Sequence, residues 1–280
     1  MRTTRPNPAP ENALVAIRTV DLLAPLHWLA LGWRDLTRGG WLSLLHGVAL
    51  AAFGMVLLLV GHQRFWLLAG AFSGFLVVAP VLATSLYAIS RALAHGRSVR
   101  WQLLVDTWLS WQQARMSERG GYWCMVHFGL LLALAGTGWV MTSAALITLM
   151  ASAPVHAPVD FLRLVVLARG NYLFEIWLLM GGVLAAPIFA SSVVSMPLLL
   201  DRRISVLPAV LASWRVVLAN PAPMAVWAAL IMLLVLLGFA TGLLGLVVLV
   251  PLLGHASWHA YAALVDASAL PERPLGPLGP

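Results

Sequence analysis

Long apolar runs, many of about 18 residues or more, are the feature that most restricts how this chain can fold. An α-helix rises 1.5 Å per residue, so a run of that length crosses the roughly 30 Å hydrocarbon layer of a bilayer. Hydrophobic residues make up 61% of the chain and charged residues only 10%, whereas a soluble domain is about 25% charged. The sequence therefore predicts an all-α, polytopic transmembrane helical bundle.

Six spans account for these runs, within an integral membrane domain that covers residues 13–266. The predicted spans are 41–61, 65–90, 122–150, 173–200, 224–241 and 242–265. Between them lie amphipathic segments that are expected to rest on the membrane surface, at 13–38, 91–119 and 204–219. The ends of the chain are rich in proline and polar residues, which predicts disordered tails at 1–12 and 267–280.

Arginine supplies all 17 basic side chains, and its distribution predicts the orientation of the chain. Six spans place both termini on one side of the membrane, and 14 of the arginines fall on that side. The opposite side has only Arg64, Arg163 and Arg169. Because basic residues gather on the cytoplasmic side of membrane proteins, we expect both termini to be cytoplasmic. The net charge of +7 is explained in this way, and no nucleic-acid partner is expected.

Two pairs of segments suggest an internal repeat. Residues 34–46 and 115–127 share the pattern R-x-x-x-R-G-G-aromatic-x-x-x-x-His, and residues 74–87 and 245–258 share a pattern centred on a proline. A third, looser version of the proline pattern lies at 191–205. These patterns predict three units, each a surface helix followed by a hairpin of two spans. The alternative is that apolar runs resemble one another through composition alone.

Several short segments also resemble a known family. They are GWRDL at 32–36, the stretch 74–80, SMPLLLDR at 195–202, Asn220-Pro221 and GHASWHAY at 254–261. Over residues 20 to 265 the chain resembles an uncharacterised bacterial family of predicted inner-membrane proteins, a domain of unknown function. The resemblance implies a location in the bacterial inner membrane and a general architecture. It implies no reaction, and no catalytic residue is carried over from it.

Histidines form the first group of candidate site residues. His255 and His259 are four residues apart, which places both imidazoles on one helical face, a spacing that can hold a transition metal or a haem. His46 and His127 lie about five residues inside their own spans on the same cytoplasmic side, which would place all four histidines at a similar depth. The alternative is that the histidines belong to the interfacial aromatic belt or cap carbonyls. We expect no cofactor, with haem or a transition metal as the alternative.

Charged residues end the fourth predicted span, at Asp201, Arg202 and Arg203. A charge at the bilayer centre costs about 2.5–3.5 kcal/mol on insertion scales, so these groups should lie at the interface or face a partner. One interpretation is a stop signal with solvated charges. The other is a clamp between units, in which Asp201 pairs with Arg34 or Arg215.

Prolines lie inside three predicted spans, at Pro80, Pro197 and Pro251. Each removes a backbone hydrogen bond and kinks its helix, and the freed carbonyl needs a new partner. Such kinks serve either helix packing or a transport path between helices.

Motifs of soluble enzymes are missing from the sequence, including G-x-S-x-G, a phosphate-binding P-loop, C-x-x-C and H-E-x-x-H. The sequence therefore favours a non-enzymatic protein, either permease-like or a membrane scaffold. Its expected partner is the lipid bilayer, and other membrane proteins are candidates. A haem- or metal-binding accessory subunit of a membrane redox complex is the alternative. A membrane-embedded enzyme acting on lipid ranks third.

Overall fold

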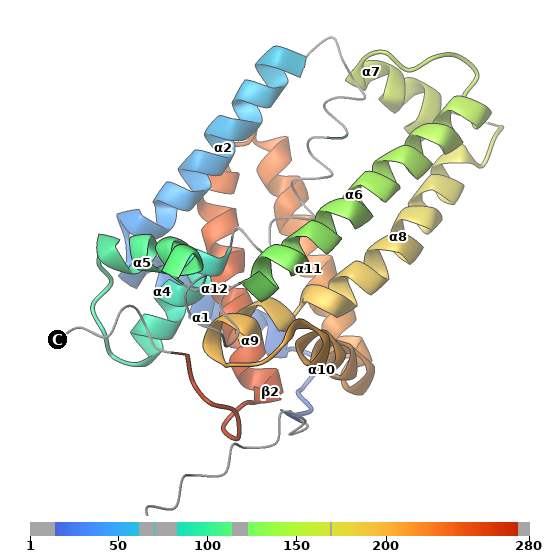
Figure 1. Ribbon diagram of the computed structural model, residues 1–280. Helices are drawn as coiled ribbons and strands as arrows, with labels where there is room; N and C mark the ends of the chain where they lie inside the picture. The colour runs from blue at the N-terminus through green and yellow to red at the C-terminus, as the bar shows by residue number, and fades with distance from the viewer. Residues whose placement is uncertain (1–14, 62–69, 71–82, 114–122, 169, 274–280) are drawn as a thin grey trace, which may run out of the picture.

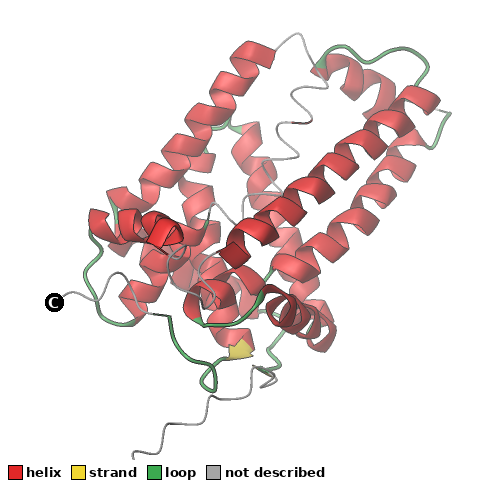
Figure 2. Cartoon of the chain, viewed as in Figure 1, coloured by secondary structure: helices red, strands yellow, loops and turns green. Residues whose placement is uncertain are grey.

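The structure is a computed structural model that describes residues 15–61, 70, 83–113, 123–168 and 170–273. Its helices are α1 (Ala24–Gly39), α2 (Trp41–Gly61), α4 (Thr84–Ala94), α5 (Trp101–Gln113), α6 (Trp123–Met150), α7 (Pro158–Phe161), η2 (Leu162–Val166), α8 (Leu173–Ser192), α9 (Ser195–Asp201), α10 (Val206–Ala219), α11 (Pro221–Ala240) and α12 (Leu246–Leu264). The strands β1 (Ala16–Ile17) and β2 (Val265–Asp266) form one short antiparallel pair. Helices dominate the described chain (Figures 1 and 2), so the predicted all-α bundle is confirmed.

Within the described residues, five stretches of helix are long and apolar enough to cross a membrane. They are Trp41–Leu59, His127–Met150, Leu173–Asp201, Pro221–Ala240 and Leu246–Leu264. These stretches lie at the first, third, fourth, fifth and sixth predicted spans. Most of the second predicted span, 65–90, lies outside the described residues, so the three-unit repeat stays a prediction. The protein is a multi-pass, helical membrane protein.

The long helices run between two ends of the molecule (Figure 1). One end holds α1, α4, α9, α10 and the strand pair, whereas α7 and η2 lie at the other end. The segments predicted to lie on the membrane surface contain α1, α5 and α10. Leu26 and Trp33 of α1 are exposed, as is Leu22 just before the helix. Such exposure suits contact with lipid.

The fourth predicted span, 173–200, is divided into two helices. Proline at position 197 has no N–H, and its ring clashes with the carbonyl four residues earlier, at Val193. Helix α8 accordingly ends at Ser192, and α9 begins at Ser195 after a turn. The Val194 N–H donates to the Ser213 hydroxyl of α10 at 3.3 Å. Every residue of α9 is buried, so this break moves the SMPLLLD segment into the protein interior.

Helix α12 lies at the centre of the packing and contacts α1, α2, α4, α9 and α11. Glycines allow the close approaches of α1 and α2 to α12. A Cβ on Gly32 would lie 2.7 Å from the Ala256 nitrogen, and one on Gly47 would overlap the Val247 carbonyl. Pro251 explains the second contact, because it lacks the N–H that would bind the Val247 carbonyl. The proline kink and the glycine therefore bring α2 and α12 together.

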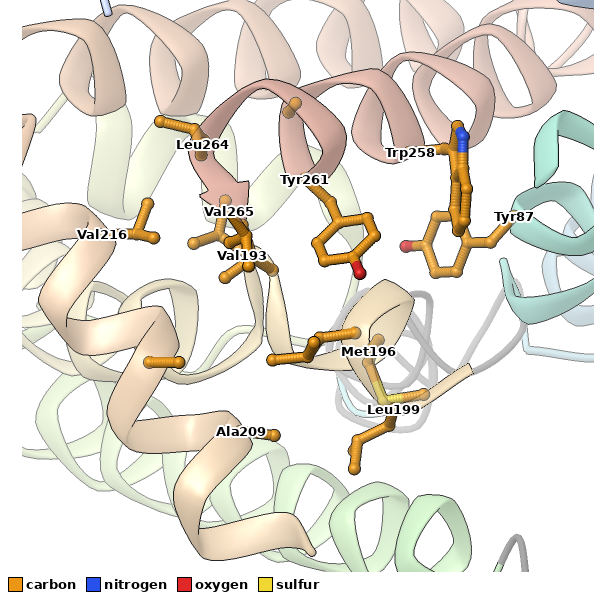
Figure 3. Close-up of a cluster of buried hydrophobic side chains, with 14 of the residues drawn as sticks. Tyr87, Val193, Met196, Leu199, Ala209, Val216, Trp258, Tyr261, Leu264 and Val265 are labelled. Atoms are coloured by element: carbon orange, nitrogen blue, oxygen red, sulfur yellow. The ribbon is translucent and has the colours of Figure 1, made fainter. Parts of the chain in front are cut away.

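A buried cluster joins α12 to α9 and α10 (Figure 3). Trp258 and Tyr261 of α12 have ring centroids 5.3 Å apart, and Tyr261 faces Met196 of α9 in the same cluster. Ala209 and Val216 of α10 are fully buried on the other side. The cluster fixes α9 and α12 relative to each other at the end of the molecule that carries the candidate site.

Residues 267–273 differ from the sequence-based expectation of a disordered tail that begins at 267. The Arg203 N–H donates to the Pro271 carbonyl at 2.9 Å, and the Arg273 N–H donates to the Asp201 carbonyl at 2.9 Å. The carbonyls at the end of a helix need partners outside it, and this segment supplies some of them for α9. The predicted tail at 1–12, like residues 274–280, lies outside the described residues.

Candidate functional site

A fully buried histidine lies where α12, α2 and α4 meet. His255 Nε2 is 2.9 Å from the Ser43 hydroxyl of α2, and Nδ1 is 2.8 Å from the Ser90 hydroxyl of α4. The side chain of His255 has no exposed surface, and both serines are buried. A neutral imidazole donates from one nitrogen and accepts at the other, so the two hydroxyls satisfy both. His255 thereby joins three helices through hydrogen bonds.

The second histidine of α12 forms an ion-pair contact with α1. His259 Nε2 lies 2.7 Å from Asp35 Oδ2, and the exposed fraction of the two side chains is 12% and 3%. Burial raises the pKa of Asp35, but hydrogen bonds from His259 and Ser90 outweigh it, so the pKa lies below its ordinary value. Ser90, whose hydroxyl lies 2.8 Å from His255, is thus also a near neighbour of Asp35. The Asp35–His259 pair therefore lies next to the hydrogen bonds that join Ser43, His255 and Ser90.

His46 lies beside this network on α2. Its Nδ1 is 2.9 Å from the Leu42 carbonyl and its Nε2 is 2.7 Å from the Ser85 hydroxyl of α4. A carbonyl only accepts, so in the neutral ring Nδ1 carries the proton and Nε2 accepts from Ser85. We call the set Asp35, Ser43, His46, Ser85, Ser90, His255 and His259 the junction network.

A second buried group of charges surrounds the end of α9. Arg91 Nε of α4 lies 2.7 Å from Asp201 Oδ1, an ion pair without the alignment of a hydrogen bond. The same guanidinium donates to the carbonyls of Arg273 at 2.7 Å and Asp201 at 3.3 Å. Tyr261 of α12 donates to Asp201 Oδ2 at 2.8 Å. Asp201 therefore ties α4, α9 and α12 to the segment that ends at Arg273.

This arrangement corrects the partners predicted for Asp201. Arg34 lies instead 3.9 Å from Asp35, and Arg215 donates to the Val15 carbonyl at 3.1 Å. Arg202 pairs with Asp201 at 2.9 Å and with Glu272 at 3.1 Å. Burial lowers the pKa of Arg202, but the Asp201 carboxylate raises it by more, so the pKa is above its ordinary value.

The other predicted site residues are more scattered. His127 has an exposed side chain on α6, unlike the three histidines at the junction. Pro251 is buried in α12 next to the network, Pro197 lies in the first turn of α9, and Pro80 is outside the described residues. Across the described ranges, no group of three or more His, Cys, Asp and Glu side chains is placed to hold a metal ion.

Sequence reasoning missed the serines, Asp35 and Arg91. A single serine in an apolar helix, such as Ser43, gives no signal of its own. Asp35 did have one, because it is an acidic residue among the apolar positions of α1 and in the GWRDL segment. Arg91 was counted only as a positive-inside charge, although it is 2% exposed.

Comparison with known proteins found one family that is similar to part of this chain. Residues 67–201 match a family described as a predicted integral membrane protein, DUF2189. The matched stretch is similar to that family. It includes the segment 74–80, all but the last residue of the segment 195–202, and both members of the Arg91–Asp201 pair. Asp35, His255 and His259 lie outside the matched stretch. No curated protein and no solved structure matches the chain.

Proposed function

We propose that this protein is a non-enzymatic, permease-like protein of the bacterial inner membrane, and that protons pass along its junction network. The observation that carries the proposal is a series of neighbouring polar side chains, which runs from His259 and Asp35 past Ser90 to the buried His255 and Ser43. Ionisable side chains within membrane helices are costly, and chains of Asp and His are typical of proton pathways.

The chemistry of the network suits proton movement. Imidazole binds and releases a proton near neutral pH, and a serine hydroxyl both donates and accepts. His259 is 12% exposed, at the end of the molecule that holds α1 and the strand pair. His255 is fully buried, one helical turn further into α12. A proton taken up at His259 and Asp35 would therefore reach His255 through Ser90.

The proposed orientation follows from the arginines and has its own test. Both termini lie in the cytoplasm, so the Asp35–His259 pair faces that side. A fluorescent protein fused after residue 280 should be bright, and alkaline phosphatase fused there should be inactive. The reverse result would place the pair on the periplasmic side and turn the proposed direction of proton uptake around.

Proton flux into liposomes tests the function itself. The purified protein is reconstituted with a pH-sensitive dye inside the vesicles, and a potassium gradient with valinomycin supplies the driving force. Wild-type vesicles should acidify faster than empty ones, and His255→Ala should abolish the difference. His127→Ala is the matched control, because that histidine is exposed on α6. Equal rates in empty and wild-type vesicles, or in wild type and His255→Ala, would refute the proposal.

A haem- or metal-binding accessory protein remains the second candidate. The spacing of His255 and His259, one helical turn apart on α12, favours it, because imidazole is a common ligand of haem and of transition metals. Ligation through His255 requires its bonds to Ser43 or Ser90 to break. Haem absorbance and bound metal in protein purified from cells test this candidate. An apo protein, unchanged by His255→Ala, would remove it.

A further inference from the structure

Two exposed tryptophans stack against each other where α2 and α5 begin. The ring centroids of Trp41 and Trp101 are 6.4 Å apart, with an angle of 9° between the planes. Their exposed fractions are 66% and 51%, unusually high for large aromatic side chains. Trp41 is the first residue of the span Trp41–Leu59. Tryptophan is enriched at the level of the lipid headgroups, which is where the start of a span lies.

Arginines flank this tryptophan pair. Arg38 lies in the last turn of α1, one short turn before Trp41, and Arg100 directly precedes Trp101. Both side chains are exposed, and in the part of the chain that the structure describes neither forms an ion pair. The first turns of α2 and α5 hold no acidic residue. Arg38 and Arg100 therefore place two positive charges beside the pair in the sequence, whereas the acidic residue of α5, Asp106, lies more than one turn further along that helix.

The nearest acidic side chain along α1 does not neutralise this charge. The Asp35 carboxylate is 3% exposed and lies 2.7 Å from His259, so it belongs to the interior. Positive charge next to exposed indoles at the start of a membrane span is complementary to a phospholipid, in which a negatively charged phosphate lies directly above the hydrocarbon chains.

We propose that Arg38, Arg100, Trp41 and Trp101 form a binding surface for the headgroup of an anionic phospholipid. Guanidinium groups bind phosphate oxygens through paired hydrogen bonds, and indoles pack at the glycerol level. A zwitterionic lipid offers the same phosphate but no net charge, so the surface should prefer the anionic lipid. This inference is independent of the proton pathway, because none of its residues belongs to the junction network.

Native mass spectrometry with added lipid tests the proposal. Purified protein is titrated with dioleoylphosphatidylglycerol and, separately, with dioleoylphosphatidylcholine. Each basic residue near an anionic surface contributes roughly a fivefold gain in affinity, so Arg38→Gln or Arg100→Gln should weaken phosphatidylglycerol binding about fivefold and the double variant about 25-fold. Phosphatidylcholine binding should change little. Trp101→Ala should weaken the binding of both lipids.

Arg163→Gln is the matched control, because Arg163 is exposed on η2 at the opposite end of the molecule. If this variant loses the same affinity for phosphatidylglycerol, the lipid is attracted to the overall charge of the protein and the proposal is overturned. So would equal binding of both lipids, or displacement of phosphatidylglycerol by excess inorganic phosphate. A dimer peak that disappears in Trp101→Ala would assign the surface to a second copy of the chain instead. Circular dichroism of each variant checks that it is folded.

Discussion

Replacing Arg91 by leucine should destabilise the protein strongly, since it leaves a buried carboxylate without its main partner. Arg91 and Asp201 have side chains that are 2% and 8% exposed, with 2.7 Å between Nε and Oδ1. Removing one member of a buried ion pair costs about 3–5 kcal/mol. Asp201 keeps contacts with Arg202 and Tyr261. We therefore expect a loss for Arg91→Leu near the lower limit, about 3 kcal/mol.

The converse change, Asp201→Asn, leaves the buried Arg91 guanidinium without its negatively charged partner. Arg91 keeps its bonds to the Arg273 carbonyl at 2.7 Å and the Asp201 carbonyl at 3.3 Å, but both acceptors are neutral. We expect this variant also to lose about 3–5 kcal/mol. The double variant should lose less than the sum of the two, with a coupling energy of about 0.5–3 kcal/mol.

The assay is unfolding of the purified protein in mixed micelles by increasing fractions of sodium dodecyl sulfate, followed by circular dichroism. Arg163→Leu is the control, because an exposed substitution should change the free energy of unfolding by no more than about 0.5 kcal/mol. Losses that add up in the double variant would refute the ion pair. If Arg91→Leu lowers the free energy of unfolding no more than the control does, the Arg91–Asp201 pair is not buried.

Three further predictions use other features of the structure. Gly47→Ala should lower the free energy of unfolding by about 1–3 kcal/mol through overlap with the Val247 carbonyl, whereas Gly138→Ala, with nothing within 4 Å of a Cβ, should not lower it. The pKa of Asp35 is lowered in the folded state, so its contribution to stability is present above pH about 4 and lost as pH falls further. The stability gap between wild type and Asp35→Asn, measured by the same unfolding assay across pH, should therefore narrow below pH 4; a constant gap would contradict it. Tyr261→Phe should cost about 1.5–3 kcal/mol, since it removes a bond to a charged group, and a neutral result would show that Asp201 does not need that donor.

The positions of the long helices could be predicted from composition alone. The run from Trp41 to Gly61 is apolar except for Ser43 and His46 and is flanked by a glycine pair and a polar turn, and α2 has those bounds. A proline kink was also predictable at Pro197. The separate, buried helix α9 was not, because its burial depends partly on contacts with α4 and α12, which are distant in sequence.

The side-chain partners could be predicted least. His255 and His259 stood out by their spacing, but Ser43 and Ser90 are ordinary residues until the helices bring them together. One of the two interpretations of Asp201 was a clamp, with Arg34 or Arg215 as partner. The arginine that pairs with it in the structure, Arg91, lies 110 positions earlier in the chain. No local periodicity links residues so far apart.

The strap formed by residues 270–273 has a consequence for biogenesis. Arg91 reaches its full set of contacts only when the Arg273 carbonyl is in place, and α10, α11 and α12 must be synthesised before that residue. Until then, the Arg91 guanidinium of α4 lacks the Arg273 carbonyl, and the Asp201 carboxylate of α9 lacks the Tyr261 hydroxyl of α12. The corner around Asp201 is therefore completed late, and we expect nascent chains that stop before α12 to be the forms most exposed to membrane quality-control proteases.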